Sequence, residues 1–248
     1  MTVDLKKELT FLNSTCKLDK FFSDSECKEL IDFYDQTPVE ELSSTYSPEK
    51  NRRQSVAYIK STHLLYNKLQ DKIRKICPQV LNTLDIVPDN LYRHSLDIDK
   101  DAIIPLPDEV EQCKYRVYEL FISKYSVGDY CGPHPDNFYI GRMYREWFFL
   151  DKGYDHSDIH KNPRLFLISG LLNNPQDFTG GTLNVYKYIN DKSAEEITQQ
   201  KGDVVCMYPS IEHEVTPIES GERYAFISWA YLDHEDFYPE NAEWDVVK

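Results

Sequence analysis

The spacing of apolar residues changes at Lys114, and this change restricts the chain to folds that place helices before a strand-rich core. After Lys114, short runs of β-branched and aromatic residues alternate with turn sequences such as Gly-Gly, Asn-Asn and Ser-Gly-Glu. The runs span residues 115–125, 165–172, 182–188, 203–208, 212–218 and 223–231. Many short strands after a set of helices predict an α+β fold with a sheet sandwich or open barrel as its C-terminal core.

The segment before Lys114 is predicted to be mainly helical. Ser23-Asp24-Ser25-Glu26 offers an N-cap, and the apolar residues that follow it recur at helical spacing. Residues 58–76 continue this pattern, whereas prolines break it further on. Residues 85–112 are therefore expected to form a long irregular connection. The apolar residues of the first helix are Cys27, Leu30, Ile31 and Tyr34.

A chain of 248 residues is long enough for one large domain. We expect residues 1–113 to form a helical support region and residues 114–235 to form the core of the same domain. Residues 137–162 interrupt the strand series with many aromatic and charged side chains, which is typical of a lid or binding loop. Residues 236–248 are expected to be a C-terminal tail.

Charge and cysteine content narrow the functional class. The formal net charge is −14, so an extended phosphate backbone would be repelled and nucleic acid is not an expected partner. The six cysteines form no CxxC pair, and no apolar run resembles a signal peptide or a membrane span. We therefore expect a cytoplasmic protein with reduced thiols and no membrane partner. The sequence does not predict the oligomeric state.

The motif His134-Pro135-Asp136, followed far downstream by His213, predicts a metal site. Side chains at i and i+2 of a strand share one face, so His134 and Asp136 can reach one ion from a single strand end. His213 begins another predicted strand and can supply the third ligand. Two histidines and one carboxylate are the ligand set of non-haem Fe(II) sites that keep open coordination positions.

A second His-x-Asp motif offers an alternative position for the metal. It is His156-Ser157-Asp158, with His160 two positions further on. Residues 155–161 are polar on all sides and lack a strand pattern, which favours a solvated loop. The first motif is favoured because only it is followed at a suitable distance by a histidine and an arginine.

Arg223 lies ten residues after His213, across a predicted turn at residues 219–221. This spacing predicts that the two residues lie on paired neighbouring strands and face one pocket. Arg223 and Trp229 share one strand face with Ala225 and Ile227, so a guanidinium and an indole would line a dry pocket. A guanidinium binds carboxylates in a bidentate manner, which suits a small diacid. The alternative is a structural salt bridge with one of the 42 acidic residues.

Residues from about 114 to 235 resemble the prolyl 4-hydroxylase-like group of Fe(II)/2-oxoglutarate dioxygenases. The order and spacing of several short motifs agree with that family, and the opening segment from Phe21 to Leu30 resembles its strand-then-helix start. The matching motifs are Tyr125-Ser126-Val127-Gly128-Asp129-Tyr130, His134-Pro135-Asp136-Asn137, Gly180-Gly181-Thr182-Leu183, Gly202-Asp203, Pro209-Ser210, His213-Glu214-Val215-Thr216-Pro217 and Gly221-Glu222-Arg223-Tyr224 through to Trp229.

The resemblance implies a double-stranded β-helix core, of the jelly-roll or cupin-like kind, with supporting N-terminal helices. It implies that His134, Asp136 and His213 hold Fe(II), that Arg223 binds the distal carboxylate of 2-oxoglutarate, and that Tyr125 and Trp229 line the cosubstrate pocket. O2 would be the second cosubstrate, and ascorbate is a further candidate cofactor. Ser169, Gly170 and Leu171 occupy places that can carry a second hydroxyl contact to 2-oxoglutarate, and the sequence leaves that contact unassigned.

The reaction implied is hydroxylation of an unactivated C–H bond coupled to conversion of 2-oxoglutarate to succinate and CO2. Halogenation is disfavoured because the Asp136 carboxylate takes the coordination position that a halide would need. The substrate expected first is a prolyl or other amino-acid residue of a peptide or protein, and the alternative is a free amino acid or small metabolite. Candidate substrate contacts are Tyr130, Tyr139 and Trp147, unless these aromatic residues form a small core of the lid itself.

Two hypotheses from other classes stay open at this point. One is a non-catalytic cupin-like metal-binding module, and the other is an interaction scaffold with an inert jelly roll. Arg223 argues against the first, because a bare structural metal site has no use for a buried guanidinium. The intact set of three metal ligands argues against the second.

Overall fold

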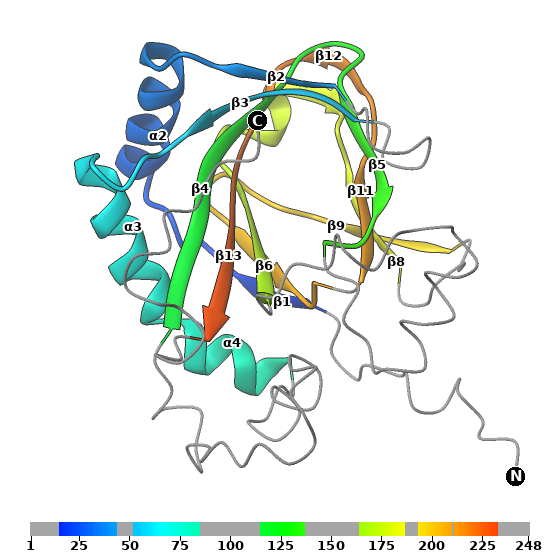
Figure 1. Ribbon diagram of the computed structural model, residues 1–248. Coiled ribbons are helices and arrows are strands. Elements are labelled where there is room, and N and C mark those ends of the chain that lie inside the picture. Colours follow the sequence, from blue (N-terminus) through cyan, green and yellow to red (C-terminus); the bar gives the residue numbers. More distant parts are fainter. Residues whose placement is uncertain are drawn as a thin grey trace, which may run out of the picture.

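The computed structural model describes residues 15–43, 52–84, 115–136, 164–186, 193–209 and 211–232. Their main feature is a curled antiparallel sheet that encloses an interior (Figure 1). One wall of the sheet is made, in spatial order, by β1 (Thr15–Leu18), β10 (Val204–Met207), β6 (Arg164–Leu171), β13 (Arg223–Leu232), β4 (Tyr115–Tyr125) and β3 (Arg52–Tyr58).

The opposite wall continues from β3 without a break in the hydrogen-bonded order. A shorter strand, β2 (Glu40–Ser43), pairs with β3, and a separate two-stranded ribbon joins β7 (Phe178–Gly180) to β12 (Ile218–Gly221). The wall itself consists of β5 (Tyr130–His134), β11 (Glu212–Val215), β8 (Leu183–Tyr186) and β9 (Ala194–Ile197).

The α-helices that the structure describes cover the outer side of the first wall (Figure 1). They are α2 (Asp24–Gln36), α3 (Leu64–Arg74) and α4 (Cys77–Thr83), and a short 3-10 helix, η3 (Pro175–Asp177), precedes β7. This arrangement is the double-stranded β-helix with N-terminal helices that the sequence predicted, so the fold prediction is confirmed. No helix among the described residues is long and apolar enough to cross a membrane.

Alternation along the strands divides the apolar residues between two cores. One core fills the space between the helices and the first wall, where Phe22 packs edge-on against Phe226 with ring centroids 5.2 Å apart. The other core lies inside the curled sheet and includes Phe121 of β4 and Trp229 of β13. Both faces of β4 and β13 are therefore buried, which explains why their sequences are so rich in apolar residues.

The predicted start of the first helix is confirmed. Ser23 caps α2, accepting a hydrogen bond from the backbone N–H of Glu26, whose carboxylate in turn accepts from the Ser23 N–H. The same carboxylate binds Lys72 of α3 at 2.6 Å, so one residue both caps its own helix and ties it to the next. This reciprocal pair fixes the first turn of α2 against the sheet.

The N-terminal half is less helical than predicted. Residues 52–58 form β3, so the helical pattern assigned to residues 58–76 was wrong at its start, and α3 begins only at Leu64. Val56 faces the interior core while Ala57 faces the helix-side core. A strand buried on both faces shows no clean alternation, and this hid β3 in the sequence. Residues 85–112, 137–162 and 236–248 lie outside the described residues.

A glycine comparison tests the packing of α2 against the sheet. Gly202 has a φ of +86°, and a Cβ there would lie 2.2 Å from the Phe22 carbonyl oxygen, whereas Gly128 has a φ of +83° with nothing within 4 Å of a Cβ. We expect Gly128→Ala to cost about 1 kcal/mol of unfolding free energy from backbone strain alone. Gly202→Ala should cost more than about 2 kcal/mol. Urea denaturation measures both values, and equal losses would contradict the close approach.

Candidate metal centre and cosubstrate pocket

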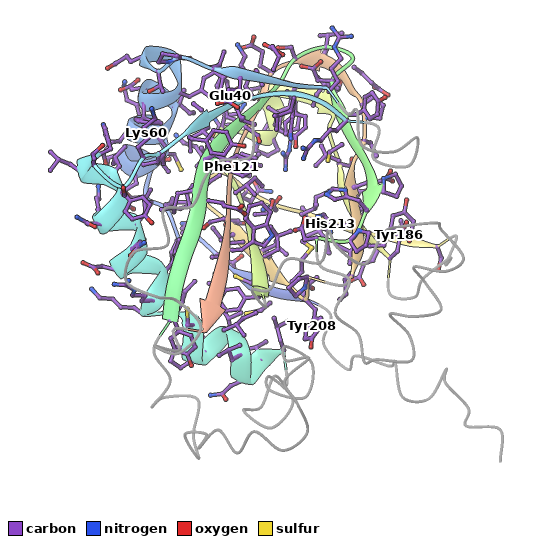
Figure 2. The ribbon with its side chains drawn as sticks, in the orientation of Figure 1. Glu40, Lys60, Phe121, Tyr186, Tyr208 and His213 are labelled. Carbon is purple, nitrogen blue, oxygen red and sulfur yellow. The ribbon has the colours of Figure 1, made fainter. Side chains whose placement is uncertain are left out.

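Three potential metal ligands converge on the inner side of the second wall. Atoms of His134, Asp136 and His213 that could each bind an ion all lie within 4.8 Å of one another. His134 ends β5, and its Cα partner on the neighbouring strand β11 is His213. Antiparallel pairing thus brings together two residues that are far apart in the sequence, and Figure 2 shows His213 on this wall, across the interior from Phe121.

Both imidazoles are oriented by the same local contact. The Nδ1 atom of His134 lies 2.8 Å from the carbonyl oxygen of Gly132, and the Nδ1 atom of His213 lies 3.0 Å from that of Ile211. A carbonyl can only accept, so each Nδ1 carries the proton and each Nε2 keeps a free lone pair. The two Nε2 atoms lie 3.6 Å and 3.7 Å from the Asp136 carboxylate. This donor set fits a divalent transition metal bound through both Nε2 atoms and the carboxylate.

Asp136 follows the end of β5 and is held from two sides. Its backbone N–H donates to the Pro209 carbonyl at 2.8 Å, and its Oδ2 atom accepts a 2.8 Å hydrogen bond from the indole Nε1 of Trp229. The first contact fixes the backbone and the second fixes the carboxylate. A carboxylate ligand restrained in this way is preorganised before any ion binds.

Trp229 makes a contact that the sequence did not predict. Its indole donates a hydrogen bond to the carboxylate of the metal ligand set, and its position beside Arg223 as a wall of the diacid pocket stays a prediction. Trp229 is 8% exposed and packs against Phe121, with ring centroids 5.8 Å apart. Alternation along β13 correctly predicted that it faces the interior. Its partner Asp136 lies 93 positions away in the sequence, beyond the reach of local patterns.

The guanidinium of Arg223 is buried and lies over the ring of Tyr125 at 5.5 Å. Its aliphatic stem passes Gly181, where a Cβ would come within 3.1 Å of the arginine Cδ. No carboxylate forms an ion pair with Arg223 among the residues described here, so the structural salt-bridge alternative finds no partner in this part of the chain. Burial lowers the pKa of Arg223. A buried cation of this kind is stabilised by an anionic ligand.

The predicted pairing of the strands that carry His213 and Arg223 was wrong. β13 pairs with β4 and β6, whereas β11 pairs with β5 and β8. Residues 219–221, where we expected a turn, belong to β12, which pairs with β7 as a separate ribbon. The chain therefore crosses from the second wall to the first between His213 and Arg223. Both residues belong to the same curled sheet, but their strands do not pair with each other.

The remaining predicted residues are distributed as follows. Tyr125 lies on the interior face of β4, and burial raises its pKa. Tyr130 begins β5 next to Cys131; since Cys131 faces the interior, strand alternation puts Tyr130 on the outer face. Tyr139 and Trp147 lie outside the described residues, as does the alternative motif at residues 156–160.

Cys131 is an interior residue that the sequence reasoning did not single out. Its Sγ lies 3.8 Å from the Nδ1 of His134, and its side chain is buried in the interior core. It therefore lies beside the metal ligands. Its position three residues before a predicted ligand was a weak signal, because a lone cysteine is most often a small core residue.

Comparisons with known proteins agree with this geometry. Residues 120–231 match the family model of the 2OG-Fe(II) oxygenase superfamily, and this segment contains all three metal ligands and Arg223. This part of the chain is therefore similar to the 2OG-Fe(II) oxygenase superfamily, and that similarity implies Fe(II) as the cofactor and 2-oxoglutarate as the cosubstrate. No curated protein sequence matches the chain significantly.

Three solved structures share the fold at low sequence identity. A viral collagen prolyl hydroxylase from Paramecium Bursaria Chlorella virus-1, in a 2OG complex, has a TM-score of 0.52 and 19% identity over 88% of this chain and 96% of that one. A Pseudomonas putida prolyl-4-hydroxylase has a TM-score of 0.51 and 13% identity over 90% and 94%. A Trichoplax adhaerens prolyl hydroxylase, in complex with a hypoxia inducible factor oxygen degradation domain peptide fragment, has a TM-score of 0.53 and 15% identity over 96% and 95%.

Replacing one ligand histidine tests the metal centre. We expect His213→Ala to abolish tight binding of one Fe(II) per chain, because it removes one of three protein ligands. His156→Ala serves as the matched control and should bind iron like the unchanged protein. Anaerobic titration with Fe(II) measures both, and loss of iron in the His156 variant alone would mean that the other His-x-Asp motif holds the metal.

Removing the indole donor tests the hydrogen bond to Asp136. Trp229→Phe keeps an aromatic ring but leaves Oδ2 without its donor, so Fe(II) affinity should fall about 10- to 100-fold. Tyr58→Phe is a suitable control. Tyr58 packs against Phe121, as Trp229 does, but no contact joins it to the three metal ligands among the described residues. Isothermal titration calorimetry with Fe(II) measures the difference, and an unchanged affinity in Trp229→Phe would show that the indole does not restrain the carboxylate.

Proposed function

We propose that this protein is a 2-oxoglutarate-dependent hydroxylase that acts on an aliphatic C–H bond of a prolyl residue in a peptide or protein. The observation that carries the proposal is the combination of the three converging ligands with a buried guanidinium that has no carboxylate partner in the described residues. A metal-binding module without catalysis would need the first feature but not the second. The similarity in fold to three prolyl hydroxylases supports the choice of substrate class.

The reaction consumes one O2 and one 2-oxoglutarate for each hydroxyl group formed. One oxygen atom enters the substrate C–H bond and the other enters succinate, while CO2 leaves from C1 of the keto acid. When bound, Fe(II) and 2-oxoglutarate supply the O2 activation and the two electrons that the hydroxylation requires. The protein supplies binding, orientation and exclusion of water.

The residues of the chain divide these tasks between them. His134, Asp136 and His213 hold the metal through one face and leave the remaining positions for the cosubstrates. Arg223 binds the distal carboxylate of 2-oxoglutarate and so fixes its distance from the metal, with Tyr125 beneath the guanidinium. The apolar interior core around Phe121 keeps bulk water from the reacting atoms.

A peptide comparison tests the substrate class. We expect succinate formation to rise in the presence of a proline-containing peptide, and the peptide to gain the mass of one oxygen atom. The same peptide with alanine in place of proline should leave succinate at the background rate, as should any peptide with the His134→Ala variant. Mass spectrometry and a coupled succinate assay give both readouts. Stimulation by free amino acids but by no peptide would overturn the peptide assignment while leaving the oxygenase class intact.

A further inference from the structure

Two buried polar atoms in the interior lack a hydrogen-bond partner among the described residues. They are the hydroxyl oxygen of Ser123 and the side-chain oxygen Oε1 of Gln54. The side chains are 0% and 4% exposed, respectively. Buried polar groups in folded proteins nearly always have a partner, so two that lack one on the same inner surface indicate a ligand that supplies the missing hydrogen bonds.

Strand register places Ser123 directly beside the arginine pocket. On β4, Ser123 lies two positions before Tyr125 and therefore faces the same side. Tyr125 is the Cα partner of Arg223, and Ser123 is the Cα partner of Ala225. On its other side, Ser123 pairs with Val56 of β3, the strand that also carries Gln54. The Ser123–Ala225 pair thus lies two residues along the two strands from the Tyr125–Arg223 pair, on the same inner face.

The arginine strand itself offers no hydroxyl group at this depth. Between Arg223 and Trp229, the interior-facing residues of β13 are Ala225 and Ile227, and neither carries a hydrogen-bond donor in its side chain. The Ser123 hydroxyl acts to lower the pKa of Tyr125, so the two groups are close, although the described residues give Ser123 no hydrogen bond of acceptable geometry. Ser123 is therefore a donor beside Tyr125, the ring over which the guanidinium lies, and none of the described residues pairs with it.

We propose that Ser123 is a positioning residue that donates a hydrogen bond to the same distal carboxylate that Arg223 binds. This inference rests on the proposed function, because it needs a dicarboxylic keto acid in the arginine pocket. A carboxylate has two oxygens with room for several donors, so a guanidinium and a hydroxyl can bind it together. Hydrogen bonding to the ligand charge also satisfies the serine, for which the described part of the chain supplies no partner.

Ser169 is the competing candidate for this hydroxyl contact. It lies on β6 with Ile227 and Val205 as its Cα partners, and alternation along β6 places it on the interior side with Leu167. It is therefore two strands away from Tyr125, whereas Ser123 lies on the same strand as Tyr125, and the Cα partner of Ser169 lies two residues further from Arg223 than that of Ser123. The Ser169 hydroxyl is also not among the buried atoms without a partner in the described residues. Register favours Ser123, and substitution of each serine separates the two.

Calorimetry with two keto acids tests the proposal. We expect Ser123→Ala to weaken 2-oxoglutarate binding to anaerobic Fe(II)-loaded protein about tenfold or more, as for a lost hydrogen bond to a charged group. Binding of 2-oxopentanoate, which has the same chain length without the distal carboxylate, should be unchanged by the substitution. Ser55→Ala is the matched control, because Ser55 is a neighbouring serine that faces the helices and bonds to Tyr34 at 2.6 Å.

Thermal stability of the metal-free protein separates ligand binding from a structural role. Ser123→Ala removes a hydroxyl that has no hydrogen-bond partner among the residues that the structure describes, so its Tm should equal or exceed that of the unchanged protein. Ser55→Ala breaks an existing hydrogen bond, so its Tm should fall. A lower Tm in Ser123→Ala with unchanged 2-oxoglutarate affinity would assign the serine to the core and overturn the proposal.

The Arg223→Met variant shows whether a negative result concerns Ser123 alone or the proposed function as well. If it binds 2-oxoglutarate as well as the unchanged protein does, the arginine pocket is not the cosubstrate site and both proposals fall. If it loses binding while Ser123→Ala does not, the function stands and the serine assignment is wrong. Loss of affinity in Ser169→Ala alone would move the hydroxyl contact to β6.

Discussion

Pairing of β5 with β11 is the constraint on which the site depends. The register sets His134 opposite His213, and the backbone carbonyls two residues before each histidine orient both rings in the same way. Because the side-chain period of a strand is two, a slip of one residue in this pairing would turn one imidazole to the outer face. The metal centre therefore depends on the register between β5 and β11 as well as on the identity of its three ligands.

The curl of the sheet buries both sides of the strands at the centre of the first wall, β4 and β13. The helices bury one side of the first wall, and the second wall closes over the other, which leaves an apolar interior with a small number of polar groups. In such surroundings, a guanidinium with no carboxylate partner and a hydroxyl with no hydrogen-bond partner in the described ranges both raise the free energy of the protein without ligand. A bound carboxylate would satisfy both groups and remove these costs. A keto acid with a second carboxylate should therefore bind better than one without it.

The tryptophan contact shows how the two walls cooperate. Trp229 belongs to the first wall and Asp136 to the end of the second, yet the indole holds the carboxylate through a hydrogen bond of 2.8 Å. β4 bulges opposite this part of β13, since the register shifts between Ile227 and Trp229 and Glu119 adopts a φ of +56°. Bulges redirect side chains near functional sites, and here the irregularity lies next to the residue that restrains a metal ligand.

Local pattern was sufficient to predict the fold class, the start of α2, the strands β4 and β13, and the identity of the residues that converge as candidate ligands. These features depend on interactions within a few residues: a capping box, alternation along a strand, and a His-x-Asp pair on one strand face. Only the tertiary structure decided that β3 bridges the two walls, that Arg223 and His213 lie on strands that do not pair, and that the indole of Trp229 donates a hydrogen bond to Asp136. The physical reason is that these relations depend on how the sheet curls and which strands pair, and strand pairing joins residues whose separation in the sequence carries no local signal.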